Sequence, residues 1–185
     1  MDLIDSLKNK AIKRKGISEA EALELFIEGS SHPYHVFSMA SEIREHFKGK
    51  EIILCGITNA KSGRCSEDCK FCAQSSHYTT DVPSYPLKGA RQIIAEADQA
   101  KKDGAEFFGI VTSGKRVKTK KEWTEIFKAI AGTHKIGIHP CASLGIIDAT
   151  KARELKSAGL FRYHHNLETA RSYFKNICTT HDYEE

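Results

Sequence analysis

The sequence predicts an α/β fold, in which about four strand–helix units form one parallel sheet behind a set of N-terminal helices. Short apolar runs typical of buried parallel strands recur along the second part of the chain. Amphipathic segments of helical length separate these runs, and a glycine ends several of them. Because strands and helices alternate, right-handed crossovers and a parallel arrangement are expected.

Residues 1–49 are predicted to form a helical segment of their own. Ser18 followed by Glu21 is a capping box, which opens a helix that extends through Phe26. Gly49 is expected to end the last helix of the segment. The three helices are expected over about residues 3–13, 18–26 and 36–47.

Residues 50–185 carry the strand–helix alternation. The strands are expected over residues 51–57, 107–111, 136–141 and 161–165, and the helices over 90–102, 120–131, 148–157 and from near residue 168. In parallel sheets of this type, chemistry is found at the C-terminal strand ends. Each expected strand is followed there by a reactive or polar group: a cysteine loop, Ser113-Gly114, Cys141 and His165-Asn166. One edge of the sheet is therefore the predicted site.

A closed TIM-type (β/α) barrel of eight units typically needs about 250 residues. After its N-terminal helices this chain has room for about half of one, so we expect a partial barrel with open edge strands. The expectation from sequence is that the chain is a truncated portion of a longer enzyme.

Composition excludes several classes of protein. The chain is 40% apolar and 28% charged with a net charge of +4, which is typical of a globular protein. Its lysines are scattered over expected helix faces, which argues against a nucleic-acid partner. The sequence shows no signal peptide and no apolar run long enough for a membrane span. Six cysteines are too few for a disulfide scaffold, so a reducing cytoplasmic location is expected.

Three cysteines, Cys65, Cys69 and Cys72, follow the first expected strand with the spacing Cys-x3-Cys-x2-Cys. Three thiolates on one loop can hold three irons of a four-iron, four-sulfur (4Fe-4S) cluster and leave the fourth iron open to a substrate. The run has no fourth cysteine. Structural zinc is the alternative, and it would require a fourth ligand such as His77.

The segments around these cysteines carry a resemblance to a known family. Residues 59–75, with Asn59-Ala60-Lys61-Ser62-Gly63 before the cysteines and Gln74-Ser75 after them, resemble the radical S-adenosylmethionine (SAM) superfamily and, within it, the biotin synthase family. The resemblance continues through residues 163–169 and 176–180. It covers nearly all of residues 36–185, which correspond to the N-terminal half of the family's barrel.

The resemblance implies a 4Fe-4S cluster on the three cysteines and SAM chelated to the open iron. Phe71 would then pack near the adenine, and Ser113 and Gly114 would lie near the methionyl group. Asn166 matches an asparagine between the ribose and dethiobiotin. Glu168 stands where the family usually has an aspartate that binds the ribose hydroxyls. The alternative for Glu168 is an acid in the first turn of a helix.

The implied reaction splits SAM to a 5′-deoxyadenosyl radical, which removes hydrogen from dethiobiotin so that sulfur insertion gives biotin. The implied electron donor is reduced flavodoxin or ferredoxin, and a homodimer is the implied assembly. A radical SAM enzyme with another substrate, or a non-catalytic iron–sulfur-binding fragment, are the alternatives.

The family takes the inserted sulfur from an auxiliary cluster, 2Fe-2S in the common pattern. This chain has Gly109 where the family has one ligand of that cluster, whereas Cys141 matches another. Cys55 and Cys178 are cysteines that the common pattern lacks, and His164 replaces its asparagine. We hypothesise that Cys55, Cys141 and Cys178 hold a differently built auxiliary cluster. The alternative for each is a small buried hydrophobic side chain.

Overall fold

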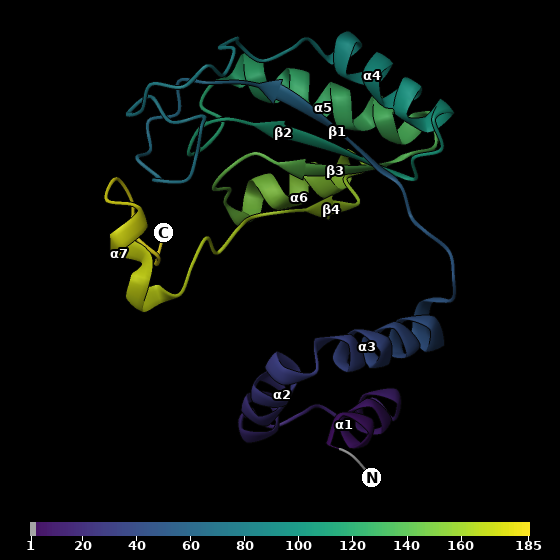
Figure 1. Ribbon diagram of the computed structural model, residues 1–185. Coiled ribbons are helices and arrows are strands. Elements are labelled where there is room, and N and C mark those ends of the chain that lie inside the picture. Colours follow the sequence, from purple (N-terminus) through teal and green to yellow (C-terminus); the bar gives the residue numbers. More distant parts are fainter. Residues whose placement is uncertain (1–2) are drawn as a thin grey trace. The chain divides into compact units, whose positions relative to one another are not determined.

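A computed structural model describes residues 3–185 of the chain, which falls into two compact units divided after Ile52 (Figure 1). Within the described range, no helix combines the length and the apolar character that crossing a membrane would require.

The first unit consists of three helices, α1 (Leu3–Ile12), α2 (Glu19–Ser31) and α3 (Pro33–Lys48). The capping box predicted before α2 is present, with the Ser18 hydroxyl and the Glu21 carboxylate each accepting from the other residue's backbone N–H. The Lys10 ammonium lies 2.6 Å from Glu21 and ties α1 to α2. Gly49 ends α3 with a φ of 68°, as its position in the sequence predicts.

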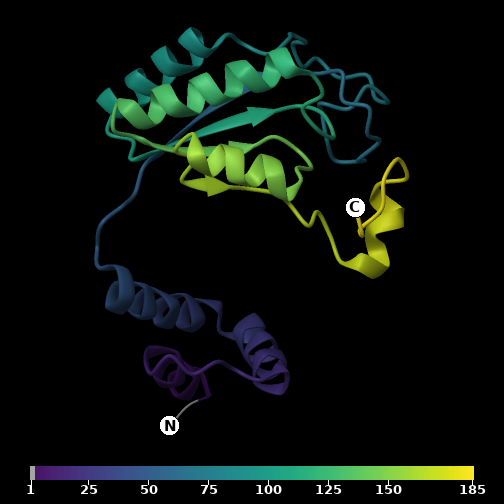
Figure 2. The same cartoon turned by 180° about the vertical axis from the view of Figure 1, so that it is seen from behind.

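The second unit alternates strands and helices. Its elements are β1 (Cys55–Lys61), α4 (Ala90–Lys102), β2 (Phe107–Thr112), α5 (Lys120–Lys135), β3 (His139–Ser143), α6 (Ala149–Ser157), β4 (Arg162–Tyr163), the 3-10 helix η1 (Arg171–Tyr173) and α7 (Phe174–Ile177). The strands form one parallel sheet in the order β1-β2-β3-β4, which confirms the predicted partial barrel. Figures 1 and 2 show this alternation of strands and helices from opposite sides.

The core lies between the sheet and its helices. Successive strand residues point to opposite faces, and one face packs against α4, α5 and α6. Phe108 and Ile110 of β2 are 2% and 0% exposed there, and they belong to the same cluster as Ile93, Ile130 and Leu155 from the three helices. We call this the helix-covered face. The opposite face, which would line the interior of a closed barrel, we call the inner face.

The first strand begins later than the apolar run predicts. Ile52 and Ile53 are 82% and 58% exposed, and β1 starts at Cys55. Pairing with β2 begins where the Glu106 N–H donates to the Leu54 carbonyl (3.0 Å), so the residues before Leu54 have no partner strand. An apolar run alone does not show which of its residues will have a neighbouring strand to pair with.

The last predicted helix is also corrected. Glu168 has a φ of 64°, in the left-handed region, which a right-handed helix does not allow. Helical structure resumes only at Arg171 and is limited to η1 and α7. The interpretation of Glu168 as an acid in the first turn of a helix is therefore wrong.

Candidate metal centre

The loop after β1 holds the three predicted cluster cysteines by backbone hydrogen bonds. The Cys65 N–H donates to the Gln74 carbonyl (3.0 Å), and the Cys65 carbonyl accepts from the Ser76 N–H (2.8 Å). The Cys72 N–H donates to the Cys69 carbonyl (2.9 Å) and makes a tight turn between these two thiols. Because both ends of the cysteine run are tied together, the three side chains are held on one short segment.

The end of β2 supports the same loop. The backbone N–H of Ser113 donates to the Lys61 carbonyl (2.9 Å), and its hydroxyl donates to the Gly63 carbonyl (2.8 Å). Gly63 has a φ of 71°, and a Cβ built on it would lie 2.7 Å from the Ser84 hydroxyl oxygen. A side chain at residue 63 would therefore be both strained and obstructed.

A cavity of about 390 Å³ opens at the C-terminal ends of the strands. It brings together the three cysteines and most of the residues expected to bind SAM. These lining residues are Cys65, Cys69, Cys72, Ser113, Gly114, Asn166 and Glu168. His165 also lines the cavity, whereas Phe71 is 60% exposed and does not. The sequence therefore predicted the place of the cavity and most of one wall.

The alternative of a zinc site completed by His77 finds no support in the loop geometry. The Nε2 of His77 donates to the Ser66 carbonyl (3.0 Å), and the side chain is exposed. The metal-ligand groups of three or more found among residues 3–185 do not include it.

Cys55 and Cys141 lie on the inner face of the sheet, apart from the cysteine loop. Cys141 is in the middle of β3, where it pairs with Gly109 on one side and Arg162 on the other, and not at the strand end as predicted. Burial raises the pKa of the Cys141 thiol; the Arg162 charge opposes this rise, and Cys55 adds to it.

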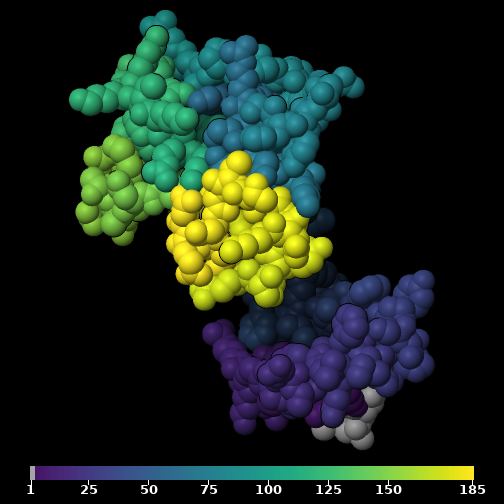
Figure 3. Space-filling view, turned by 90° about the vertical axis from the view of Figure 1, so that its left-hand side faces the viewer, coloured from purple at the N-terminus to yellow at the C-terminus, as the bar shows by residue number. Residues whose placement is uncertain are grey.

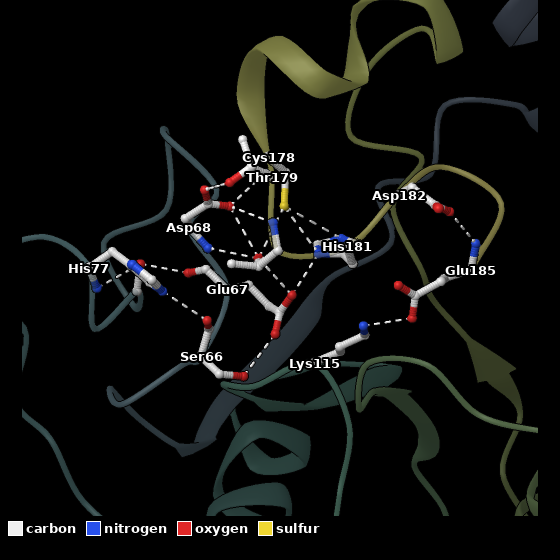
Figure 4. Close-up of polar contacts among 12 residues, drawn as sticks. Ser66, Glu67, Asp68, His77, Lys115, Cys178, Thr179, His181, Asp182 and Glu185 are labelled. Carbon is white, nitrogen blue, oxygen red and sulfur yellow. Dashed lines mark hydrogen bonds and ion pairs between the residues drawn. The ribbon is translucent and has the colours of Figure 1, made fainter.

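The last residues of the chain fold back onto the cysteine loop. The Asp68 carboxylate accepts from the backbone N–H groups of Thr179 (2.8 Å) and Thr180 (3.2 Å). The Lys70 N–H donates to the Ile177 carbonyl (3.0 Å). Figure 3 shows this yellow C-terminal segment against the residues that follow β1, and Figure 4 shows the contacts. We call residues 177–181 the returning segment.

The returning segment brings a fourth thiol to the loop. Cys178 is 1% exposed, and its sulfur, that of Cys69 and a ring nitrogen of His181 all lie within 4.8 Å of one another. Burial raises the pKa of the Cys69 thiol, and the neighbouring Cys178 raises it further. The expectation that Cys178 joins Cys55 and Cys141 is corrected, because α7 turns the chain toward the loop and away from the inner face.

Sequence reasoning missed Glu67, Asp68 and His181. Glu67 is 6% exposed and accepts from the Thr180 hydroxyl (2.8 Å) and from His181 Nδ1 (2.7 Å). Its burial raises its pKa, but hydrogen bonds from Ser66, Thr180 and His181 outweigh this effect and leave the pKa below its usual value. The two acidic residues between the cluster cysteines, Glu67 and Asp68, indicated a binding role for these acids. The sequence did not show that their partners lie in the returning segment.

A comparison with protein families finds a match to the part of the chain that carries the cysteine loop, the cavity and the parallel sheet. The Radical SAM superfamily matches residues 60–185, which is more than half of the chain. The chain belongs to the radical SAM superfamily. Members of this superfamily use a 4Fe-4S cluster and SAM. The donor set fits the cluster, because Cys65, Cys69 and Cys72 line the cavity from one loop.

Several individual proteins that are similar to this radical SAM chain are named biotin synthase. It is 49% identical over 183 residues to the biotin synthase of Geotalea uraniireducens, and 47% identical over 184 residues to that of Citrifermentans bemidjiense. It is 46% identical over 186 residues to that of Clostridioides difficile. These alignments cover 98%, 99% and 98% of the chain, but only 56%, 56% and 57% of the relatives. The chain thus spans little more than half the length of these relatives.

A solved structure with a similar fold is HydG, a maturase of the FeFe-hydrogenase. The TM-score is 0.76 at 17% identity, and the match covers 99% of this chain and 41% of HydG. At this identity the likeness shows the fold alone. It agrees with the arrangement of strands and helices described above.

Proposed function

We propose that this chain is the cluster- and SAM-binding part of a biotin synthase, which inserts sulfur into dethiobiotin to form biotin. The observation that carries the proposal is the cavity, where three thiols of one loop meet Asn166 and Glu168. The substrate is inferred from the relatives, which are named biotin synthase and are up to 49% identical to the chain. Reduced flavodoxin or ferredoxin as the donor, and a homodimer as the assembly, belong to the same proposal.

When bound, the cluster would supply the electron that cleaves SAM into methionine and a 5′-deoxyadenosyl radical. The residues of this chain would bind and orient the cofactors. Cys65, Cys69 and Cys72 would ligate iron. The amide of Asn166 and the carboxylate of Glu168, which both line the cavity, are groups suited to hydrogen-bonding ribose hydroxyls. The same cavity extends over Ile57, Val111 and Ser143 of the inner face, where a substrate would lie beside them.

An auxiliary cluster would lie on the inner face in this proposal. Cys141 and Cys55 are the thiols on that face, and Gly109 between their strands carries no side chain. A Cβ at residue 109 would lie 3.2 Å from Ile57 Cγ1, so a cysteine there would require Ile57 to move. Iron and sulfide counts in Cys141→Ser and Cys55→Ser test these two ligands, and unchanged counts would remove them.

The central test uses the 185-residue chain, reconstituted with iron and sulfide without oxygen. We expect about four irons from the cysteine loop, a brown colour, and a spin-resonance spectrum of the reduced cluster that changes when SAM is added. Cys65→Ser should lose the cluster. Glu168→Gln should keep it and bind SAM more weakly, with the exposed Glu184→Gln as its matched control. A spectrum insensitive to SAM would contradict the proposal.

Biotin formation decides the substrate. The gene product extended to the length of its relatives should convert dethiobiotin to biotin and release 5′-deoxyadenosine. Release of 5′-deoxyadenosine without biotin would assign the superfamily chemistry to another substrate.

A further inference from the structure

Cys178 and His181 have no part in the proposed function, yet they lie beside one of its cysteines. Figure 4 shows the Cys178 sulfur directed toward the imidazole of His181, and the sulfur of Cys69 completes a group whose ligand atoms all lie within 4.8 Å. The Cys178 residue is 1% exposed and the His181 side chain 16%. Two thiols and an imidazole therefore meet in a partly buried place.

The three ligand atoms lie near the spacing of a tetrahedral zinc site, although not at it. With a Zn–S distance of about 2.3 Å and a Zn–N distance of about 2.0 Å, tetrahedral angles place sulfur and nitrogen about 3.5 Å apart. Cys178 Sγ lies 4.0 Å from His181 Nε2 and 3.1 Å from His181 Nδ1. Since the sulfur is nearer to Nδ1, ligation through Nε2 requires the Cys178 side chain or the His181 ring to turn when the metal binds.

The protonation of His181 is also arranged for metal binding. Its Nδ1 lies 2.7 Å from the Oε2 of Glu67, whose residue is 6% exposed. Since a carboxylate accepts hydrogen bonds, Nδ1 carries the proton in this contact and Nε2 keeps its lone pair. A carboxylate behind a ligating histidine is the usual support of zinc sites, where it fixes the tautomer and the ring orientation.

We propose that the chain, when it holds no iron–sulfur cluster, binds one Zn²⁺ ion through Cys69, Cys178 and His181. Thiolate and imidazole ligands select zinc over magnesium or calcium. Binding releases the two thiol protons. Cys69 and His181 both line the cavity, so water takes the fourth position. Because Cys69 is also a cluster ligand, zinc and the cluster exclude each other.

The cluster-free, metal-free chain is titrated with Zn²⁺ against a coloured chelator, in the absence of oxygen. One equivalent should bind. Co²⁺ in its place should give thiolate charge-transfer absorption and the visible bands of a tetrahedral site. The assay contains neither iron nor SAM, so its result is independent of the proposed function.

Variants distinguish this site from zinc on the cysteine run itself. Cys178→Ser and His181→Gln should each weaken Zn²⁺ binding by about 100-fold or more, and Glu67→Gln by about 10- to 100-fold. Cys65→Ser, the matched control for Cys178→Ser, and His164→Gln, the control for His181→Gln, should leave the affinity unchanged.

The reverse pattern, in which Cys65→Ser abolishes binding and Cys178→Ser does not, would overturn the proposal, and so would the absence of stoichiometric binding. If Cys178→Ser loses its folded far-ultraviolet spectrum, His181→Gln decides, because its side chain is partly exposed. A second readout is the rate of iron uptake. Zinc-loaded wild type should take up iron more slowly than the metal-free chain, and His181→Gln should abolish this difference.

Discussion

The two faces of the sheet use the same strands for different purposes. On the helix-covered face, Phe108 and Ile110 are at most 2% exposed. On the inner face, Ile57 is 72% exposed and Cys141 only half-buried. Because the side chains of a strand alternate, one strand supplies both faces. The difference shows that apolar packing, and with it most of the stability, lies on the helix-covered face, whereas the inner face and the cysteine loop are left available for chemistry.

Replacing one large side chain on each face by alanine should give the largest difference in stability between the two faces. Phe108→Ala removes a ring that is 2% exposed, and the expected loss in the free energy of unfolding is about 3–5 kcal/mol. Ile57→Ala should cost less than about 1 kcal/mol, because most of that side chain already contacts water. Urea denaturation of both variants measures the difference. Equal losses would contradict the assignment of stability to one face.

The returning segment should depend on hydrogen bonds more than on apolar packing. Asp68→Ala removes the acceptor of the Thr179 and Thr180 N–H groups, which should loosen the returning segment locally. Hydrogen exchange at these two amides should speed up by about 10- to 100-fold, with little change in global unfolding. Asp182→Ala is the control, since the Asp182 carboxylate accepts from the backbone N–H groups of Glu184 and Glu185, which lie outside the returning segment. A matching loss of global stability would show that the segment is part of the core.

Tyr163 of β4 tests a polar contact between the edge of the sheet and the loop that follows β3. Its hydroxyl donates to the Gly145 carbonyl and accepts from the Leu144 N–H (3.2 Å), so Tyr163→Phe should cost about 1–2 kcal/mol. Burial raises the pKa of Tyr163 to about 12, and the Leu144 hydrogen bond only partly opposes it.

The raised pKa of Tyr163 has a consequence for alkaline stability. The unfolded tyrosine ionises near pH 10 and the folded one near 12, so the stabilisation is complete below pH 10 and is lost as the pH rises toward 12. Unfolding of wild type and Tyr163→Phe, compared from pH 8 to about pH 12, should show the two converging. A constant difference would contradict this account.

The smallest effect is expected for Glu96, an ion-paired acid at the rim of the helix-covered face. Burial raises its pKa, but hydrogen bonds from Thr58 and Lys88 outweigh this and lower it. The stabilisation is therefore present above the unfolded pKa, near 4.5, and lost as the pH falls through the folded value. Since the side chain is a third exposed, Glu96→Gln should cost less than about 1 kcal/mol. The cost should vanish in acid, and a cost that persists there would exclude ionisation as its cause.

Local signals predicted the elements whose ends they mark. The helix over residues 90–102 has the expected bounds, the capping box of Ser18 and Glu21 is present, and Asp148 caps α6. The cysteine loop also follows the first strand as predicted. In contrast, the apolar run at Ile52 and Ile53 is exposed, because strand formation depends on a partner that the run does not contain.

The sequence by itself determined the spacing of three thiols on one loop and the alternation of strands and helices that puts this loop at one edge of a parallel sheet. Only the tertiary structure decided that Cys178 reaches Cys69, that Glu168 adopts a left-handed conformation, and that Cys141 lies within its strand. The physical reason is the distance along the chain over which each kind of interaction acts. Caps and turns act over a few residues, whereas Asp68 and Thr179, 111 positions apart, meet because the packed sheet and α7 bring them together.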